Sequence, residues 1–83
     1  VGSRRGDAVW EEKKIVFEVQ LSPLSLAEAI HRSHDYRQEG YQVVWILHDR
    51  LFNQEAVSPG ERFLRAQEPT YFTNGATIYD QVE

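Results

Sequence analysis

Apolar and polar residues alternate in two short segments near the start of the chain. Residues 8–10 and 15–21 are rich in β-branched and aromatic side chains, which favours strands. The polar run of residues 11–14 between them predicts a turn, so we expect the two strands to form an antiparallel hairpin. Pro23 has no backbone N–H to donate and should end the pairing.

A helix is expected next, because Ser25 and Glu28 have the spacing of a capping box. It should run from Leu26 to Glu39, where Gly40 can take the left-handed conformation that ends a helix. The helical period gathers one face that we expect to be buried: Leu26, Ala29, Ile30, Ser33 and Tyr36.

The almost continuous apolar run 41–47 predicts a central strand that is covered on both faces and reached by a parallel crossover. Ser58 followed by Pro59 predicts the start of a second helix, which should end near Gln67. Asn74 and Gly75 then predict a type I′ hairpin between residues 71–73 and 76–79. The predicted fold is α/β, a mixed β-sheet with flanking helices in the order β-β-α-β-α-β-β.

Length and composition narrow the possible functions. The 83 residues make a single domain, and the absence of methionine, even at position 1, leads us to expect a fragment of a longer chain. Without cysteine there is no disulfide and no thiolate metal site. The net charge of −4 argues against broad nucleic-acid binding, which usually needs a basic face. No apolar run approaches the roughly 20 residues that span a membrane, and we expect a cytoplasmic protein.

Glu18 and Gln20 are two residues apart, so on a strand they share one face while Phe17 and Val19 take the other. The simpler interpretation is a half-buried strand with Glu18 and Gln20 in solvent. In the alternative, the hairpin brings Asp7 beside Glu18, and the two carboxylates bind a hard cation such as Mg²⁺. Such an ion can clamp a phosphate and activate a water molecule.

Two further places along the chain offer candidate residues. Arg32 and Tyr36 lie one helical turn apart. Either Arg32 contacts a phosphate with Tyr36 as an accessory residue, or Arg32 pairs with Glu28 at the surface while Tyr36 enters the core. His48 follows the apolar strand, where α/β proteins tend to place ligand groups, and is a possible accessory residue without an assigned role.

Several of these features together resemble the nuclease-like domain of the competence protein CoiA family. The resemblance extends over about residues 4–47. Its features are the stretch from Arg4 to Asp7, the run Phe17-Glu18-Val19-Gln20 with Ser22, the helix opened by Ser25 with Arg32 and Tyr36 on it, and the strand around Val44-Trp45-Ile46-Leu47.

That family is similar to the PD-(D/E)xK nucleases, which have a restriction-endonuclease-like core. The resemblance implies Asp7 and Glu18 as catalytic ligands of Mg²⁺ or Mn²⁺, Arg32 as a phosphate-binding residue, and DNA as the partner. It also puts Gln20 at a catalytic position that is usually lysine. Glutamine can orient a water molecule, but it supplies no charge.

The expected function is metal-dependent hydrolysis of DNA in DNA uptake or recombination. One alternative is a catalytically inactive nuclease-fold module that binds DNA or a protein partner, which the glutamine at position 20 and the acidic charge favour. Another is a structural domain that forms a homodimer through Trp10, Trp45 or Phe52.

Overall fold

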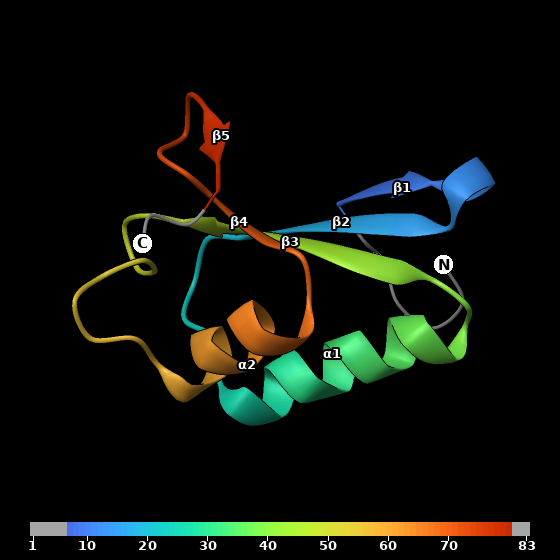
Figure 1. Ribbon diagram of the computed structural model, residues 1–83, viewed down its shortest axis with the longest axis horizontal. Helices are drawn as coiled ribbons and strands as arrows, with labels where there is room; N and C mark the ends of the chain where they lie inside the picture. The colour runs from blue at the N-terminus through green and yellow to red at the C-terminus, as the bar shows by residue number, and fades with distance from the viewer. Residues whose placement is uncertain (1–6, 81–83) are drawn as a thin grey trace.

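Two helices pack on a single face of a five-stranded mixed sheet in the computed structural model, which describes residues 7–80 (Figure 1). The elements are β1 (Ala8–Trp10), the 3₁₀ helix η1 (Glu11–Lys13), β2 (Ile15–Gln20), α1 (Leu26–Gln38), β3 (Gln42–His48), α2 (Pro59–Gln67), β4 (Thr70–Thr73) and β5 (Ile78–Tyr79). The predicted α/β class and the order β-β-α-β-α-β-β are confirmed.

The strands lie in the sheet in the same order as in the sequence, β1-β2-β3-β4-β5. The inner pairs β2–β3 and β3–β4 are parallel, and the outer pairs β1–β2 and β4–β5 are antiparallel. Lys14, with a left-handed φ of 55°, closes the turn between β1 and β2. The resulting register places Ala8 opposite Phe17 and Trp10 opposite Ile15.

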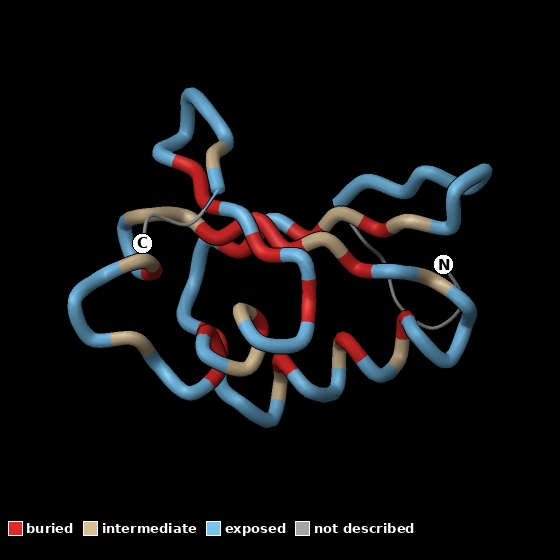
Figure 2. Tube along the Cα trace, in the orientation of Figure 1, coloured by how far each residue is buried: buried red, intermediate tan, exposed pale blue. Residues whose placement is uncertain are grey.

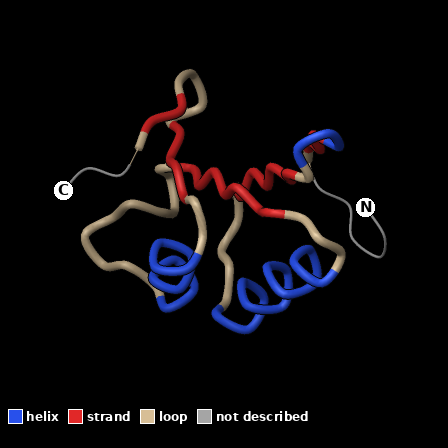
Figure 3. The backbone as a smooth tube through the Cα atoms, turned by 45° about the vertical axis from the view of Figure 1, so that its right-hand side comes forward, coloured by secondary structure: helices blue, strands red, loops and turns tan. Residues whose placement is uncertain are grey.

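The core lies between the sheet and the two helices, which are on the same side of the sheet in both Figure 1 and Figure 3. It consists of Val16, Leu24, Ala29, Tyr36, Val43, Trp45, Leu47, Phe52, Leu64 and Phe72. In Figure 2 the buried residues, in red, are concentrated along the central strands and on the helices. The prediction that the strand around residues 41–47 is covered on both faces is wrong, because within residues 7–80 no helix packs on the second face.

That second face of the sheet carries an apolar hollow, lined by Ile15, Phe17, Val44, Ile46, Tyr71 and Ile78. Tyr71 and Ile78 are exposed on it, and so is Val19 farther along β2. We call this surface the open face. The three parallel strands at the centre of the sheet thus have one face in the core, while the other face has no helix on it, although Ile46 there is buried by its neighbours.

Helix α1 begins as predicted, since Ser25 Oγ accepts a 3.1 Å hydrogen bond from the backbone N–H of Glu28. It ends at Gln38, one residue before the predicted end, and Gly40 has a left-handed φ of 85°. The predicted buried face is too wide: Leu26 and Ile30 are exposed, because only the line of residues that meets the sheet and α2 is covered. That line consists of Ala29, Ser33 and Tyr36.

The start of α2 is held against the segment before α1. Gly60 packs so closely that a Cβ atom there would lie 2.6 Å from the carbonyl oxygen of Leu24, so no larger residue fits without a shift. Glu61 is buried and accepts hydrogen bonds from Arg65 at 2.6 Å and from the backbone N–H of Asn53 at 3.0 Å. These contacts tie the long loop after β3 to α2.

The hairpin at the end of the chain differs from the predicted type I′ turn, which needs left-handed backbone at two successive residues. Within the loop 74–77 only Gly75 has a positive φ, of 98°. The side chain of Asn74 instead accepts hydrogen bonds from the backbone N–H groups of Ala76, at 2.8 Å, and Thr77, at 3.0 Å. The loop therefore has four residues rather than two.

Trp45 and Phe52 are both buried in the core, so the prediction that they build a homodimer surface is wrong. Trp10, of which 49% is exposed, lies at the surface on β1. Of the helices between residues 7 and 80, none combines the length and the apolar character needed to cross a membrane.

Candidate functional site

The β1–β2 hairpin brings Asp7 next to Glu18. The backbone N–H of Asp7 donates to the carbonyl oxygen of Phe17 at 3.2 Å, and Asp7 Oδ2 accepts a 2.7 Å hydrogen bond from the backbone N–H of Val19. These two bonds lie on either side of Glu18 in the sequence, so Asp7 continues the register to a position opposite Glu18. The structure thus brings together the two residues that the sequence predicts as metal ligands.

Glu18 and Gln20 share one face of β2, but it is the face that the helices cover. Only 6% of each residue is exposed. Phe17 and Val19 point to the open face instead. The interpretation of Glu18 and Gln20 as the solvated side of a half-buried strand is therefore wrong: the polar side chains lie under α1, and the apolar ones face outward.

Arg32 reaches this face from α1 and contacts three side chains. Its Nη1 atom lies 3.6 Å from Glu18 Oε1 and donates a 3.1 Å hydrogen bond to Gln20 Oε1. Its Nε atom donates to Glu28 Oε1 at 2.7 Å. The predicted pair of Arg32 with Glu28 is confirmed, and the same guanidinium also faces Glu18. The phosphate contact of Arg32 stays a prediction.

Tyr36 connects the core to the same group. Its ring is buried, and its hydroxyl donates a long hydrogen bond, 3.5 Å, to Glu18 Oε1. The one-turn spacing of Arg32 and Tyr36 therefore lets both side chains approach a single carboxylate oxygen.

Gln20 uses both ends of its amide. The Nε2 atom donates to the carbonyl oxygen of Ser22 at 2.9 Å and to Ser22 Oγ at 3.1 Å, while Oε1 accepts from Arg32. Gln20 is therefore fixed in orientation, and it links the end of β2 to the guanidinium on α1.

Burial raises the pKa of the Glu18 carboxyl above its usual value, and the negative charge of Asp7 acts in the same direction. The positive charge of Arg32 and the hydrogen bond from Tyr36 lower the pKa, but they offset only part of the rise. A cation between the two carboxyl groups would stabilise the charged form of Glu18.

Asp7 and Glu18 are the two residues of this group that could hold a divalent cation such as Mg²⁺ or Mn²⁺. In the part of the chain that the structure describes, there is no group of three or more His, Cys, Asp or Glu side chains arranged to hold a metal. Mg²⁺ usually keeps several of its water molecules and binds through one or two carboxylates, which Asp7 and Glu18 can supply.

His48, the possible accessory residue, lies apart from this group. The β3 residue opposite Gln20 is Leu47, and His48 follows it with its side chain directed to the other face. Its Nδ1 atom accepts a 3.0 Å hydrogen bond from the backbone N–H of Arg50. The structure does not bring His48 to Glu18.

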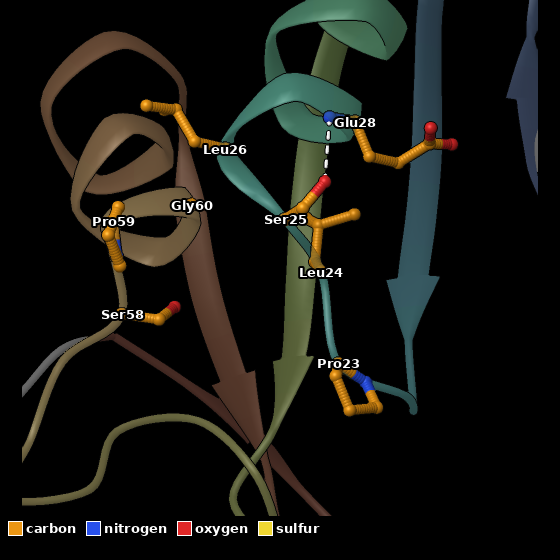
Figure 4. A pocket seen from close by; sticks show the side chains of 8 residues that line it. All are labelled: Pro23, Leu24, Ser25, Leu26, Glu28, Ser58, Pro59 and Gly60. Atoms are coloured by element: carbon orange, nitrogen blue, oxygen red, sulfur yellow. Dashed lines mark hydrogen bonds between the residues drawn. The ribbon is translucent and has the colours of Figure 1, made fainter.

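Glu28, which the sequence presented as a capping-box residue and a surface partner of Arg32, lies close to the same group. It is in the first turn of α1, beside a hollow between the starts of α1 and α2 (Figure 4). In Figure 4 its side chain points away from α2 and towards β2. The four-residue spacing predicts that Glu28 pairs with Arg32 on a helix. It does not predict that the pair lies near Glu18, because that depends on how α1 crosses β2.

Fold and site together define a small α/β domain in which paired carboxylates lie beside an arginine and a tyrosine from the first helix. The chain belongs to the family described as "Competence protein CoiA, nuclease-like domain", whose model matches residues 2–72. The match runs from before β1 almost to the end of β4 and so includes every residue of the site; Arg4 lies outside the described residues. No curated protein and no solved structure matches the chain.

Proposed function

We propose that this domain is a metal-dependent nuclease that hydrolyses DNA phosphodiester bonds during DNA uptake or recombination in the cytoplasm. The observation that carries the proposal is the position of Asp7, just before β1, beside Glu18 on β2, with Arg32 next to them. Membership in a family described as nuclease-like supports the same conclusion.

Asp7 and Glu18 would hold the Mg²⁺ or Mn²⁺ ion. The ion, when bound, supplies charge to polarise the phosphate and lowers the pKa of the attacking water molecule. Tyr36 keeps the Glu18 carboxylate in place through its hydroxyl, and the hydrogen bond from Val19 does the same for Asp7. The hairpin and the core thus fix both ligands before DNA arrives.

Arg32 supplies the positive charge that Gln20 lacks. A guanidinium has several N–H donors in a planar arrangement that suits phosphate oxygens. Gln20 Oε1 lies 3.1 Å from Arg32 Nη1 and orients it. Gln20 on β2 thus occupies the position of the usual lysine, and Arg32 on α1 provides the positive charge.

The test is cleavage of labelled single- and double-stranded DNA by the full-length protein with Mg²⁺, with Mn²⁺ and with a chelator. Asp7→Asn and Glu18→Gln remove one charge each, and Glu39→Gln removes an equal charge at the exposed C-terminal end of α1. We expect activity only with a divalent ion, loss in the first two variants, and no change in the third. Cleavage that survives both site substitutions would refute this site.

A second candidate function is DNA or protein binding without catalysis. It is favoured by the amide of Gln20, whose Nε2 atom is committed to Ser22 rather than turned towards Glu18. Mn²⁺ titration separates the two functions. A protein that binds DNA but takes up no Mn²⁺ at millimolar concentration is a binding module, whereas Mn²⁺ uptake that depends on Glu18 supports the nuclease.

A further inference from the structure

We propose that Glu28 is a positioning residue of the site: it holds Arg32 beside Glu18 and keeps the guanidinium from occupying the carboxylate that would take the metal. This inference rests on the proposed metal-dependent function. It assigns to Glu28 a role in metal binding, although Glu28 itself is not a ligand.

The distances around Arg32 are unequal. Its hydrogen bonds go to Glu28, at 2.7 Å from Nε, and to Gln20, at 3.1 Å from Nη1. The separation of 3.6 Å between Nη1 and Glu18 Oε1 is longer than the 2.7–3.2 Å of a normal N–H···O hydrogen bond. Glu18 therefore feels the charge of Arg32 without being covered by it.

This arrangement needs a strong partner for Arg32, because Glu18 is the more attractive one. The Glu18 side chain is only 8% exposed, against 41% for Glu28. Charges attract more strongly where solvent screens them less, so an unrestrained guanidinium would be drawn to Glu18. An arginine can bind a carboxylate through two parallel hydrogen bonds and would then occupy the oxygens that a cation needs.

Glu28 can resist this attraction because its position is fixed by the helix. Its backbone N–H is bound to Ser25 Oγ at the start of α1, and it lies four residues before Arg32, the favourable order for a pair on a helix. Figure 4 shows the side chain extending from the first turn towards β2. Gln20 holds the guanidinium from the other side, so Arg32 lies between two neighbours at hydrogen-bond distance.

The test is Mn²⁺ binding to the full-length protein, measured from the signal of free Mn²⁺ by electron paramagnetic resonance. The variants are Glu28→Gln, Arg32→Gln, the double variant, and the matched control Glu39→Gln at the C-terminal cap of the same helix. We expect Glu28→Gln to raise the Kd about tenfold, a typical coupling for contacting charges. Glu39→Gln should stay within about twofold, the range of an exposed, distant charge.

The double variant identifies the cause. If Glu28 acts through Arg32, Glu28→Gln should change the Kd by less than about twofold once Arg32 is replaced by glutamine. A loss that persists in the Arg32→Gln background is a direct charge effect and overturns the inference, as does a Glu28→Gln variant that binds as tightly as Glu39→Gln. Both results leave the nuclease proposal standing. If the wild-type protein takes up no Mn²⁺, the proposed function fails and this inference with it.

Discussion

Asp7 Oδ2 accepts a 2.7 Å hydrogen bond from the backbone N–H of Val19, so a side chain at the edge of the sheet completes the pairing of β1 with β2. The carboxylate has two functions here: it fixes the hairpin and places a negative charge opposite Glu18. A substitution can separate these functions, because asparagine keeps an acceptor and loses the charge.

Asp7→Asn should keep the thermal stability of the protein and weaken Mn²⁺ binding more than tenfold, since one of the two proposed carboxylate ligands is lost. Asp7→Ala should weaken Mn²⁺ binding as much and also lower the melting temperature, because the Val19 N–H loses its acceptor. Calorimetric titration and thermal unfolding measure the two effects. Equal Mn²⁺ affinity in wild type and Asp7→Asn would contradict the assignment of Asp7 as a ligand.

Glu18→Gln should raise the stability of the metal-free protein at neutral pH. Burial raises the pKa of Glu18 above 4.5 in the folded state, so over the interval from 4.5 to the raised pKa the folded protein binds a proton that the unfolded chain has released. Stability therefore falls as the pH rises through this interval, and it stays lower above it. The amide introduced by Glu18→Gln cannot ionise, so this loss of stability is absent from the variant.

The measurement is urea unfolding in a chelator between pH 4 and 8 for both proteins. The difference in unfolding free energy, variant minus wild type, should increase with pH and then level off. A constant difference over the whole range would contradict the prediction. Added Mn²⁺ should stabilise the wild type and leave Glu18→Gln unchanged, because binding to the folded state alone raises stability.

Arg32→Gln should lower the rate of DNA cleavage roughly a hundredfold, the typical cost of one lost charge-stabilising donor. Arg32→Lys keeps the charge but not the planar set of donors, so it should recover only part of the rate. Single-turnover cleavage with saturating Mn²⁺ isolates this step from metal binding. A lysine variant with the full wild-type rate would show that charge alone is sufficient.

Two substitutions separate the contribution of the buried Tyr36 ring from that of its hydroxyl, which bonds to Glu18. Tyr36→Phe removes the hydroxyl that donates the 3.5 Å hydrogen bond to Glu18 and should cost less than about 1 kcal/mol of stability. Tyr36→Ala empties a fully buried position and should cost about 3–5 kcal/mol. Urea unfolding of the two variants tests this. A large loss in Tyr36→Phe would mean that the hydroxyl is a principal support of Glu18.

Much of the fold can be predicted from the sequence because its signals are local. Ser25 and Ser58 mark the starts of two helices through bonds to residues three positions later, and residues 11–14 close the first hairpin. The type of the last turn was not predictable in the same way. The side chain of Asn74 caps the loop, and this competes with the two-residue turn that the same residue also favours.

The site was predictable only in part, for a physical reason. Alternation shows that Glu18 and Gln20 share a face, but it does not say which face the helices cover. Since Phe17 and Val19 are apolar, their side of β2 was expected to face the core, whereas the helices cover the side of Glu18 and Gln20. The proposed role of Glu28 depends on the distance between α1 and β2. That distance cannot be deduced from the spacing of residues along the chain.

Because the open face lies on the opposite side of the sheet from Glu18, the solubility of the protein can be changed there independently of the site. Large exposed apolar surfaces promote self-association, and here Tyr71 and Ile78 lie on the opposite side of the sheet from Glu18. A polar substitution such as Ile78→Lys, on the short strand β5, should therefore improve solubility at high concentration while leaving Asp7, Glu18 and Arg32 untouched. The domain should thus become easier to purify and crystallise without a change at any residue of the proposed site.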